Sequence, residues 1–280
     1  MPPLPPAGWH PDPHQPSRLR YWDGTVWTAW VSERGEVESA PLADGPQGIR
    51  RWPPRTVWTC VLGLLAISLV AGIAYAIVSA AFGESAALTL AVTFPIQFAG
   101  IYLIVRRISR RYGSGNVVED LTWRVQGRDV WPGLGTAFLA MVVTAIAVNA
   151  VRAWLDIPVE PTDQFGTLDD TTVARAILAV AAVLGAPLFE ELLFRGVVLH
   201  ALLRWGKAVA VAGSSLLFGL THLSVELAGT ENVLVVVSTT VTGAVLAWTV
   251  LRLDRLGPAM VAHSAFNLIA VVATFATTTT

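Results

Sequence analysis

Seven long apolar stretches follow one another after residue 56, and they restrict the fold of this chain more than any other feature. Each is long enough to cross the roughly 30 Å hydrocarbon core of a bilayer as a helix. They cover residues 57–82, 86–105, 131–151, 173–200, 208–226, 232–251 and 257–275. The composition agrees, since 54% of the residues are hydrophobic, 14% are charged and the mean hydropathy is +0.57. We predict an all-α polytopic membrane protein of about seven transmembrane helices, with its bundle over residues 56–276.

Basic residues predict how the bundle sits in the membrane, because loops rich in Lys and Arg stay on the cytoplasmic side. Such residues precede the first span and follow the second, fourth and sixth: Arg50, Arg51, Arg55, Arg106, Arg107, Arg110, Arg111, Arg204, Lys207, Arg252 and Arg255. The acidic loop over residues 156–170 falls on the other side. We therefore expect a multi-pass protein of the plasma (cytoplasmic) membrane, with its N-terminus cytoplasmic and its C-terminus outside. Residues 112–130 are too polar to cross and predict a cytoplasmic loop or interfacial helix.

The first 55 residues differ from the rest, being polar and rich in Pro, Gly and Trp. Aromatic and polar residues alternate around Asp23-Gly24, which predicts a small β-hairpin in a soluble module over residues 1–31. Residues 32–55 have the composition of a flexible linker. A Gly-Trp-x-x-Asp-Pro start and a Tyr-Trp-Asp-Gly-x-x-Trp-Thr finish resemble a short Trp-rich bacterial module of unknown function. A hairpin this small would be marginal alone, so we expect it to contact the membrane surface or a partner.

Charge and cysteine content exclude some functions. The net charge is -1, and the basic residues are scattered among the spans instead of forming a stripe, so no nucleic-acid partner is expected. The single cysteine, Cys60, lies within an apolar run, so it can form neither an intrachain disulfide nor a thiolate metal site.

A few polar residues interrupt the apolar spans, and ionisable groups at membrane depth are costly enough to need a partner or a function. They are Glu190, Glu191, Arg195, His200, His222, His263 and Asn267. Glu191 precedes Arg195 by four residues, the spacing of an intrahelical ion pair. That pairing leaves Glu190 free to face the bundle interior as a catalytic carboxylate. The alternative is a buried ion pair that only fixes helix packing.

Spacing also predicts which of these groups meet. Glu190 and His222 are equally far from Gly206, which marks the turn between the fourth and fifth spans, so an antiparallel pair of helices places them at similar depth. His263 and Asn267 are four residues apart and share one face of the last span. A carboxylate and a histidine can take a proton from water, and a second histidine and an amide can donate hydrogen bonds to an oxyanion. The alternative is a divalent metal such as zinc, with Glu190, His222 and His263 as its ligands.

Three ordered motifs carry a family resemblance: Glu190-Glu191-Leu-Leu-Phe-Arg195, Phe218-Gly-Leu-Thr-His222 and His263-Ser-Ala-Phe-Asn267. They resemble the motifs of the CAAX protease and bacteriocin-processing family, which is similar to the Rce1-type prenyl-protein endopeptidases, over residues 170–275. The resemblance implies that Glu190 and His222 activate water while His263 and Asn267 form the oxyanion hole. Glu191 and Arg195 then support the structure, and the substrate is a peptide or protein that can carry a lipid. Whether a metal takes part stays open.

Two other functions compete with an endopeptidase. A non-catalytic membrane scaffold or bacteriocin-immunity protein could bind a peptide or partner in the same cavity. A proton-coupled transporter is disfavoured, because the polar groups are confined to the fourth, fifth and seventh spans and no inverted repeat is evident. His200 and Glu226 lie outside the motifs and are expected to be interfacial.

Overall fold

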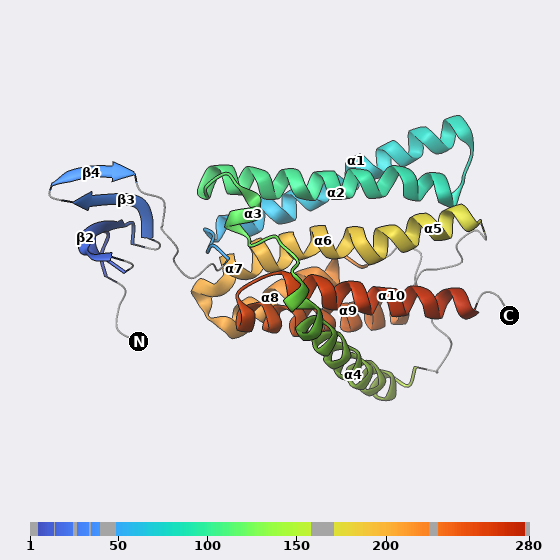
Figure 1. Ribbon diagram of the computed structural model, residues 1–280. Coiled ribbons are helices and arrows are strands. Elements are labelled where there is room, and N and C mark those ends of the chain that lie inside the picture. The colour runs from blue at the N-terminus through green and yellow to red at the C-terminus, as the bar shows by residue number, and fades with distance from the viewer. Residues whose placement is uncertain are drawn as a thin grey trace.

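The computed structural model describes residues 5–13, 15–24, 27–33, 35–39, 49–157, 171–223 and 229–277. Four strands form a small antiparallel sheet near the N-terminus, and a bundle of helices follows (Figure 1). The strands are β1 (Gly8–Asp12), β2 (Gln15–Trp22), β3 (Trp27–Glu33) and β4 (Glu36–Ser39). The helices outside the fourth span are α1 (Arg55–Phe82), α2 (Ala86–Tyr112), α3 (Val117–Asp120), η1 (Gly127–Asp129), α4 (Val130–Leu155), α8 (Lys207–Leu220), α9 (Gly229–Leu253) and α10 (Gly257–Thr277).

The fourth span is a continuous helical segment, Thr172–Trp205, that changes its winding along its length. It consists of α5 (Thr172–Val180), η2 (Ala181–Gly185), α6 (Ala186–Glu190), η3 (Glu191–Val198), α7 (Leu199–Leu202) and η4 (Leu203–Trp205). Both η2 and η3 are π-helical, and η4 is a 3₁₀ turn. Figure 1 shows the fourth span in the middle of the bundle, with α1 and α2 on one side and α9 and α10 on the other.

The predicted helical membrane fold is confirmed, with one shorter helix among the seven. Six helices of the described chain are long and apolar enough to cross a membrane. The fifth stretch, expected over residues 208–226, forms only the 14 residues of α8, which is about 21 Å of helix. The side chains of Thr221 and His222 both hydrogen-bond the carbonyl of Phe218, at 2.7 and 2.9 Å, and so compete with continuation of the helix. Residues 224–226 of the expected span lie outside the described residues.

The loops expected on the cytoplasmic side do meet at one end of the bundle. The amide of Ile49 donates to the Asp254 carboxylate at 3.3 Å. Arg50 Nε lies 3.2 Å from Asp120 Oδ1, and Arg255 Nη1 lies 2.8 Å from Asp129 Oδ1. As expected, residues 112–130 form no span, only α3, η1 and their connections. Which side of the membrane this end faces stays a prediction.

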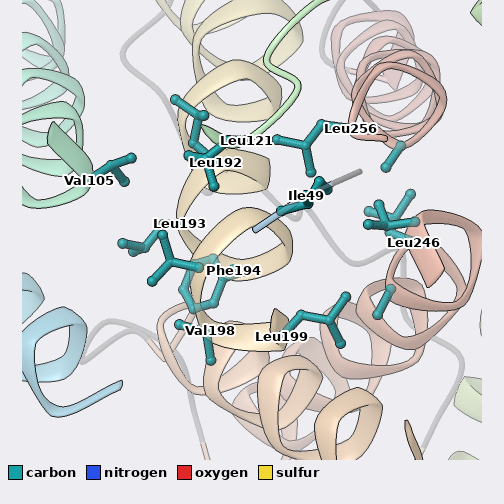
Figure 2. Close-up of a cluster of buried hydrophobic side chains, with 14 of the residues drawn as sticks. Ile49, Val105, Leu121, Leu192, Leu193, Phe194, Val198, Leu199, Leu246 and Leu256 are labelled. Carbon is teal, nitrogen blue, oxygen red and sulfur yellow. The ribbon is translucent and has the colours of Figure 1, made fainter. Parts of the chain in front are cut away.

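The buried core of the bundle is centred on the fourth span. Figure 2 shows Leu192, Leu193 and Phe194 on that span, surrounded by side chains from other parts of the chain. Ile49 lies within this cluster, and Trp52 is also buried, with its indole N–H donating to the Gly196 carbonyl at 2.9 Å. The expected linker over 32–55 is therefore shorter, because its last residues pack into the bundle.

The N-terminal sheet is also larger than the predicted hairpin. Asp23 and Gly24 do separate β2 from β3, but β3 runs to Glu33 and β4 pairs with it. Residues 32, 33 and 36–39 thus belong to the sheet and not to the linker. The Glu-rich sequence of β4 has no apolar run that would signal a strand. The rings of Trp22 and Trp27 pack edge to face at 5.3 Å.

Candidate functional site

The site begins with two adjacent carboxylates at the junction of α6 and η3. Glu190 is the last residue of α6, and Glu191 opens the π-helical segment η3. Single π-turns are rare and often occur at functional sites. They redirect side chains and alter the regular backbone hydrogen bonds of the helix. The Glu191 side chain is fully buried, whereas 22% of the Glu190 side chain is exposed. Glu190 is thus the carboxylate that a substrate or water can reach.

Glu191 forms the ion pair with Arg195 that the spacing predicts. Glu191 Oε1 lies 3.1 Å from Arg195 Nη1, and both side chains are almost fully buried. The guanidinium also donates from Nη2 to the Gly243 carbonyl at 3.2 Å and lies over the Phe218 ring, 4.3 Å from its centroid. Arg195 therefore ties the fourth span to both α8 and α9.

His263 of α10 faces both carboxylates. Its Nδ1 lies 2.9 Å from Glu191 Oε1, and its Nε2 lies 3.9 Å from Glu190 Oε2. The spacing of four residues pairs Glu191 with Arg195 alone and does not indicate this contact. It depends on how α10 is rotated against the fourth span, which no local pattern specifies. Glu191 accordingly orients His263 as well as pairing with Arg195.

His222 lies just beyond the end of α8 and is held through one ring nitrogen. Its Nδ1 is 2.9 Å from the Phe218 carbonyl, so Nδ1 carries the hydrogen and donates it. Within the described residues Nε2 makes no hydrogen bond, and in the neutral ring it offers a lone pair. No hydrogen bond or ion pair joins the described residues His222 and Glu190, so their meeting stays a prediction. The link is Phe218, whose ring packs edge to face against His222 at 4.7 Å and against His263 at 5.8 Å.

Asn267 lies one turn after His263 and contacts the other π-helical segment. Its Nδ2 donates to the Ala182 carbonyl in η2 at 2.8 Å. One N–H of the amide is therefore engaged, and the second remains for another acceptor. Sequence reasoning does not find the Ala182 and Gly243 carbonyls, because backbone partners leave no signal in residue type.

The described residues do not fit a three-ligand metal site. No group of three His, Cys, Asp or Glu side chains in that part of the chain is arranged to hold a metal ion. Of the predicted zinc ligands, Glu190 and His263 approach each other, with 3.9 Å between Glu190 Oε2 and His263 Nε2.

His200, expected near the membrane interface, packs inside the bundle close to the end of the fourth span. It is buried, and its Nδ1 lies 2.7 Å from the Arg195 carbonyl, five residues earlier in the widened turn. Glu226, the other residue expected at the interface, lies outside the described residues.

A helical bundle of membrane-spanning length with a buried carboxylate, histidine and arginine cluster defines a polytopic membrane protein with a site at helix depth. Residues 172–269 match the family described as type II CAAX prenyl endopeptidase Rce1-like. Residues 7–40 match a protein family of unknown function, DUF2510. The chain therefore contains an Rce1-like domain preceded by a DUF2510 domain, and the resemblance drawn from its motifs is confirmed. No curated protein and no solved structure matches the chain.

Proposed function

We propose that this chain is an intramembrane endopeptidase that hydrolyses a peptide bond with water activated at Glu190. One observation carries the proposal: inside the Rce1-like domain, Glu190 Oε2 is buried, makes no hydrogen bond to any residue that the structure describes and lies 3.9 Å from His263 Nε2. A buried carboxylate oxygen without a partner is costly unless a substrate, water or proton occupies it. Membrane depth makes that cost larger.

Three ionisable side chains lie around Glu190: Glu191, Arg195 and His263. Glu190 and Glu191 bring two negative charges, and Arg195 brings one positive charge. In the proposed mechanism His263 carries a hydrogen on each ring nitrogen, which brings the net charge of these four groups to zero. With Nδ1 donating to Glu191, that form still has an Nε2–H to donate.

The hydrolysis follows from these groups. Water attacks the carbonyl carbon of the scissile peptide while Glu190 takes its proton, and the Nε2 lone pair of His222 accepts a second hydrogen bond from the same water. The oxygen of the tetrahedral intermediate receives hydrogen bonds from His263 Nε2–H and from the second N–H of Asn267. The proton held by Glu190 then passes to the leaving nitrogen, and the carbon–nitrogen bond breaks. The products are a carboxylate and an amine.

No step in this scheme needs a metal, and the arrangement of the residues supports that choice. His263 Nδ1 is engaged by Glu191, and Arg195 places a positive charge beside the same carboxylate. We expect peptide cleavage to survive dialysis against EDTA or 1,10-phenanthroline. Loss of cleavage with recovery on adding Zn²⁺ would favour the metal alternative.

The substrate class follows from the position of the site. A buried cluster within helices of membrane-spanning length favours a peptide, or a lipidated protein segment, that reaches the site from the bilayer or its surface. Purified protein in lipid can therefore be offered one peptide sequence with and without an attached isoprenoid. Faster cleavage of the modified peptide supports a lipidated substrate, and equal rates support recognition of the peptide alone.

The test of the function compares variants of similar fold. Glu190→Gln and His222→Ala should each lower the rate of peptide cleavage by roughly 10²–10⁴-fold. Glu84→Gln is the matched control, because Glu84 is an exposed acid in the connection between α1 and α2. In cells, the membrane proteome of a Glu190→Gln strain should accumulate the same uncleaved proteins as a deletion strain. A biological effect that survives Glu190→Gln would favour the scaffold or immunity function instead.

A further inference from the structure

The N-terminal sheet has two chemically different faces. One face, here called the aromatic face, carries Trp9, Leu19, Tyr21, Trp30 and Ser32. The pairing of the strands brings them together, since Trp9 lies opposite Tyr21 and Leu19 lies opposite Ser32. Residues two apart on a strand share a face, which adds Trp30 beside Ser32.

The opposite face holds the charges. Asp12 and Arg20 are fully buried there, with Arg20 Nε 2.9 Å from Asp12 Oδ2. Arg18 Nε lies 2.8 Å from the same oxygen. Trp22 and Val31 are buried on this side as well. The sheet therefore covers its ion pairs and leaves its aromatic residues outside.

Large apolar side chains of the aromatic face are exposed in the sheet. Trp30 is 53% exposed, Leu19 42% and Trp9 38%. None of the five residues of the face carries a charge at neutral pH. Contiguous exposed aromatic surface on a small sheet usually marks a surface that binds protein or membrane.

A short segment between the sheet and the bundle limits how far the sheet can lie from the bundle. The sheet ends at Ser39 and the part of the chain packed in the bundle begins at Ile49, so residues 40–48 connect them. Even fully extended, they span at most roughly 35 Å, at 3.3–3.6 Å per residue. Ile49 and Trp52 are fixed to the end of the bundle through Asp254 and the Gly196 carbonyl. The sheet thus stays close to one surface of the bilayer.

We propose that the aromatic face lies in the headgroup region of the bilayer that the bundle spans. Trp and Tyr favour this region, because their rings are apolar and their N–H or O–H groups reach water. The tether makes the contact intramolecular, at an effective concentration in the millimolar range, so a weak interface suffices. Because the face carries no charge, the contact does not depend on anionic lipids.

Two neighbouring residues of β3 give a matched pair of probes. Ser32 lies on the aromatic face, and Glu33 is exposed on the other side of the strand. In the full chain with Cys60→Ala, Ser32→Cys or Glu33→Cys is spin-labelled and reconstituted in phosphatidylcholine vesicles. Collisions with oxygen report contact with lipid, and collisions with a neutral nickel chelate report contact with water.

We expect the ratio of oxygen to nickel collisions to be several-fold higher for the Ser32 label than for the Glu33 label. Adding Trp9→Ser and Trp30→Ser should remove the difference, while anionic lipid should leave it unchanged. Equal nickel access at both labels would overturn the proposal. Protection of the Ser32 label from both reagents would overturn it too, because it would place the face against protein. So would a difference that appears only with anionic lipid.

Discussion

The first and fourth spans are both long apolar helices, yet the protein uses them differently. Only 6% of the most apolar window of α1 is buried inside the protein, compared with 44% for the fourth span. The exposed side chains of α1 are large and apolar, including Leu62, Leu65, Leu69 and Ile77. Apolar composition therefore marks both as membrane helices but does not say which one faces lipid.

Polar residues distinguish the first span from the fourth, whereas mean hydropathy does not. Within the first four spans, the charged residues of the proposed site are all on the fourth, at Glu190, Glu191 and Arg195. Glu191 and Arg195 are fully buried, and Glu190 is partly exposed. Protein surrounds that span on several sides and supplies partners from α8, α9 and α10. Lipid offers no such partners, which explains why α1 carries none of these groups.

Arg195→Met on the fourth span should lower the stability of the protein far more than a substitution on α1. It removes the positive charge beside Glu191 and leaves buried carboxylates uncompensated, so the free energy of unfolding should fall by about 3–5 kcal/mol. Arg195→Lys should recover only part of it, because one ammonium cannot reproduce the contacts to Glu191 and the Gly243 carbonyl. Unfolding in mixed micelles titrated with SDS measures the loss.

The control for Arg195→Met lies on α1. Leu65 is 63% exposed, so Leu65→Ala should change the free energy of unfolding by no more than about 0.5 kcal/mol. Similar losses for Leu65→Ala and Arg195→Met would contradict the contrast between a lipid-facing and a protein-facing span.

Glu191→Gln should test whether the buried partner on the fourth span acts through His263. It keeps an oxygen that can accept from His263 Nδ1 but removes the negative charge beside the ring. We expect kcat to fall on the order of 100-fold with little change in KM. Steady-state cleavage of a peptide by the purified protein in lipid provides both constants.

A double variant distinguishes positioning from a general loss of structure. If Glu191 works through His263, then adding Glu191→Gln to His263→Ala should lower kcat little further. Independent, multiplicative losses would show that Glu191 acts in some other way.

The same contrast explains how far sequence could predict this protein. The apolar stretches, the Glu191–Arg195 pair and the turn at Asp23-Gly24 depend on local spacing. The structure contains the pair, a break between β2 and β3 at Asp23-Gly24, and a helix for each stretch, with the fifth shortened to α8. The contact between Glu191 and His263 joins residues 72 positions apart and depends on helix rotation. The π-helical turns and the early end of α8 arise from tertiary packing and local side-chain competition, which leave no periodic signal.

Glycines offer a finer test of close packing. On the fourth span, a methyl group at Gly185 would collide with the ring of Phe98 on α2, while at Gly72 on α1 it would meet nothing within 4 Å. Gly185→Ala should therefore cost about 1–3 kcal/mol. Gly72→Ala should be neutral or stabilising by up to about 1 kcal/mol, because Ala favours the helix. The same SDS titration applies, and equal effects would show that Gly185 has room that the packing does not indicate.

A pair of tryptophans gives the smallest expected effect. Trp52 is buried and donates its indole N–H to the Gly196 carbonyl in η3, whereas Trp58 on α1 is 69% exposed. Trp52→Phe keeps most of the ring but removes the donor, so it should lower the free energy of unfolding by about 1 kcal/mol. Trp58→Phe should lower it by less than about 0.5 kcal/mol. If Trp52→Phe also speeds hydrogen exchange at Gly196 and its neighbours, then the segment before α1 holds the widened turn that follows Glu190. An unchanged exchange rate would instead confine the effect of Trp52 to global stability, and the π-helical turn would be held by Arg195 and the surrounding core.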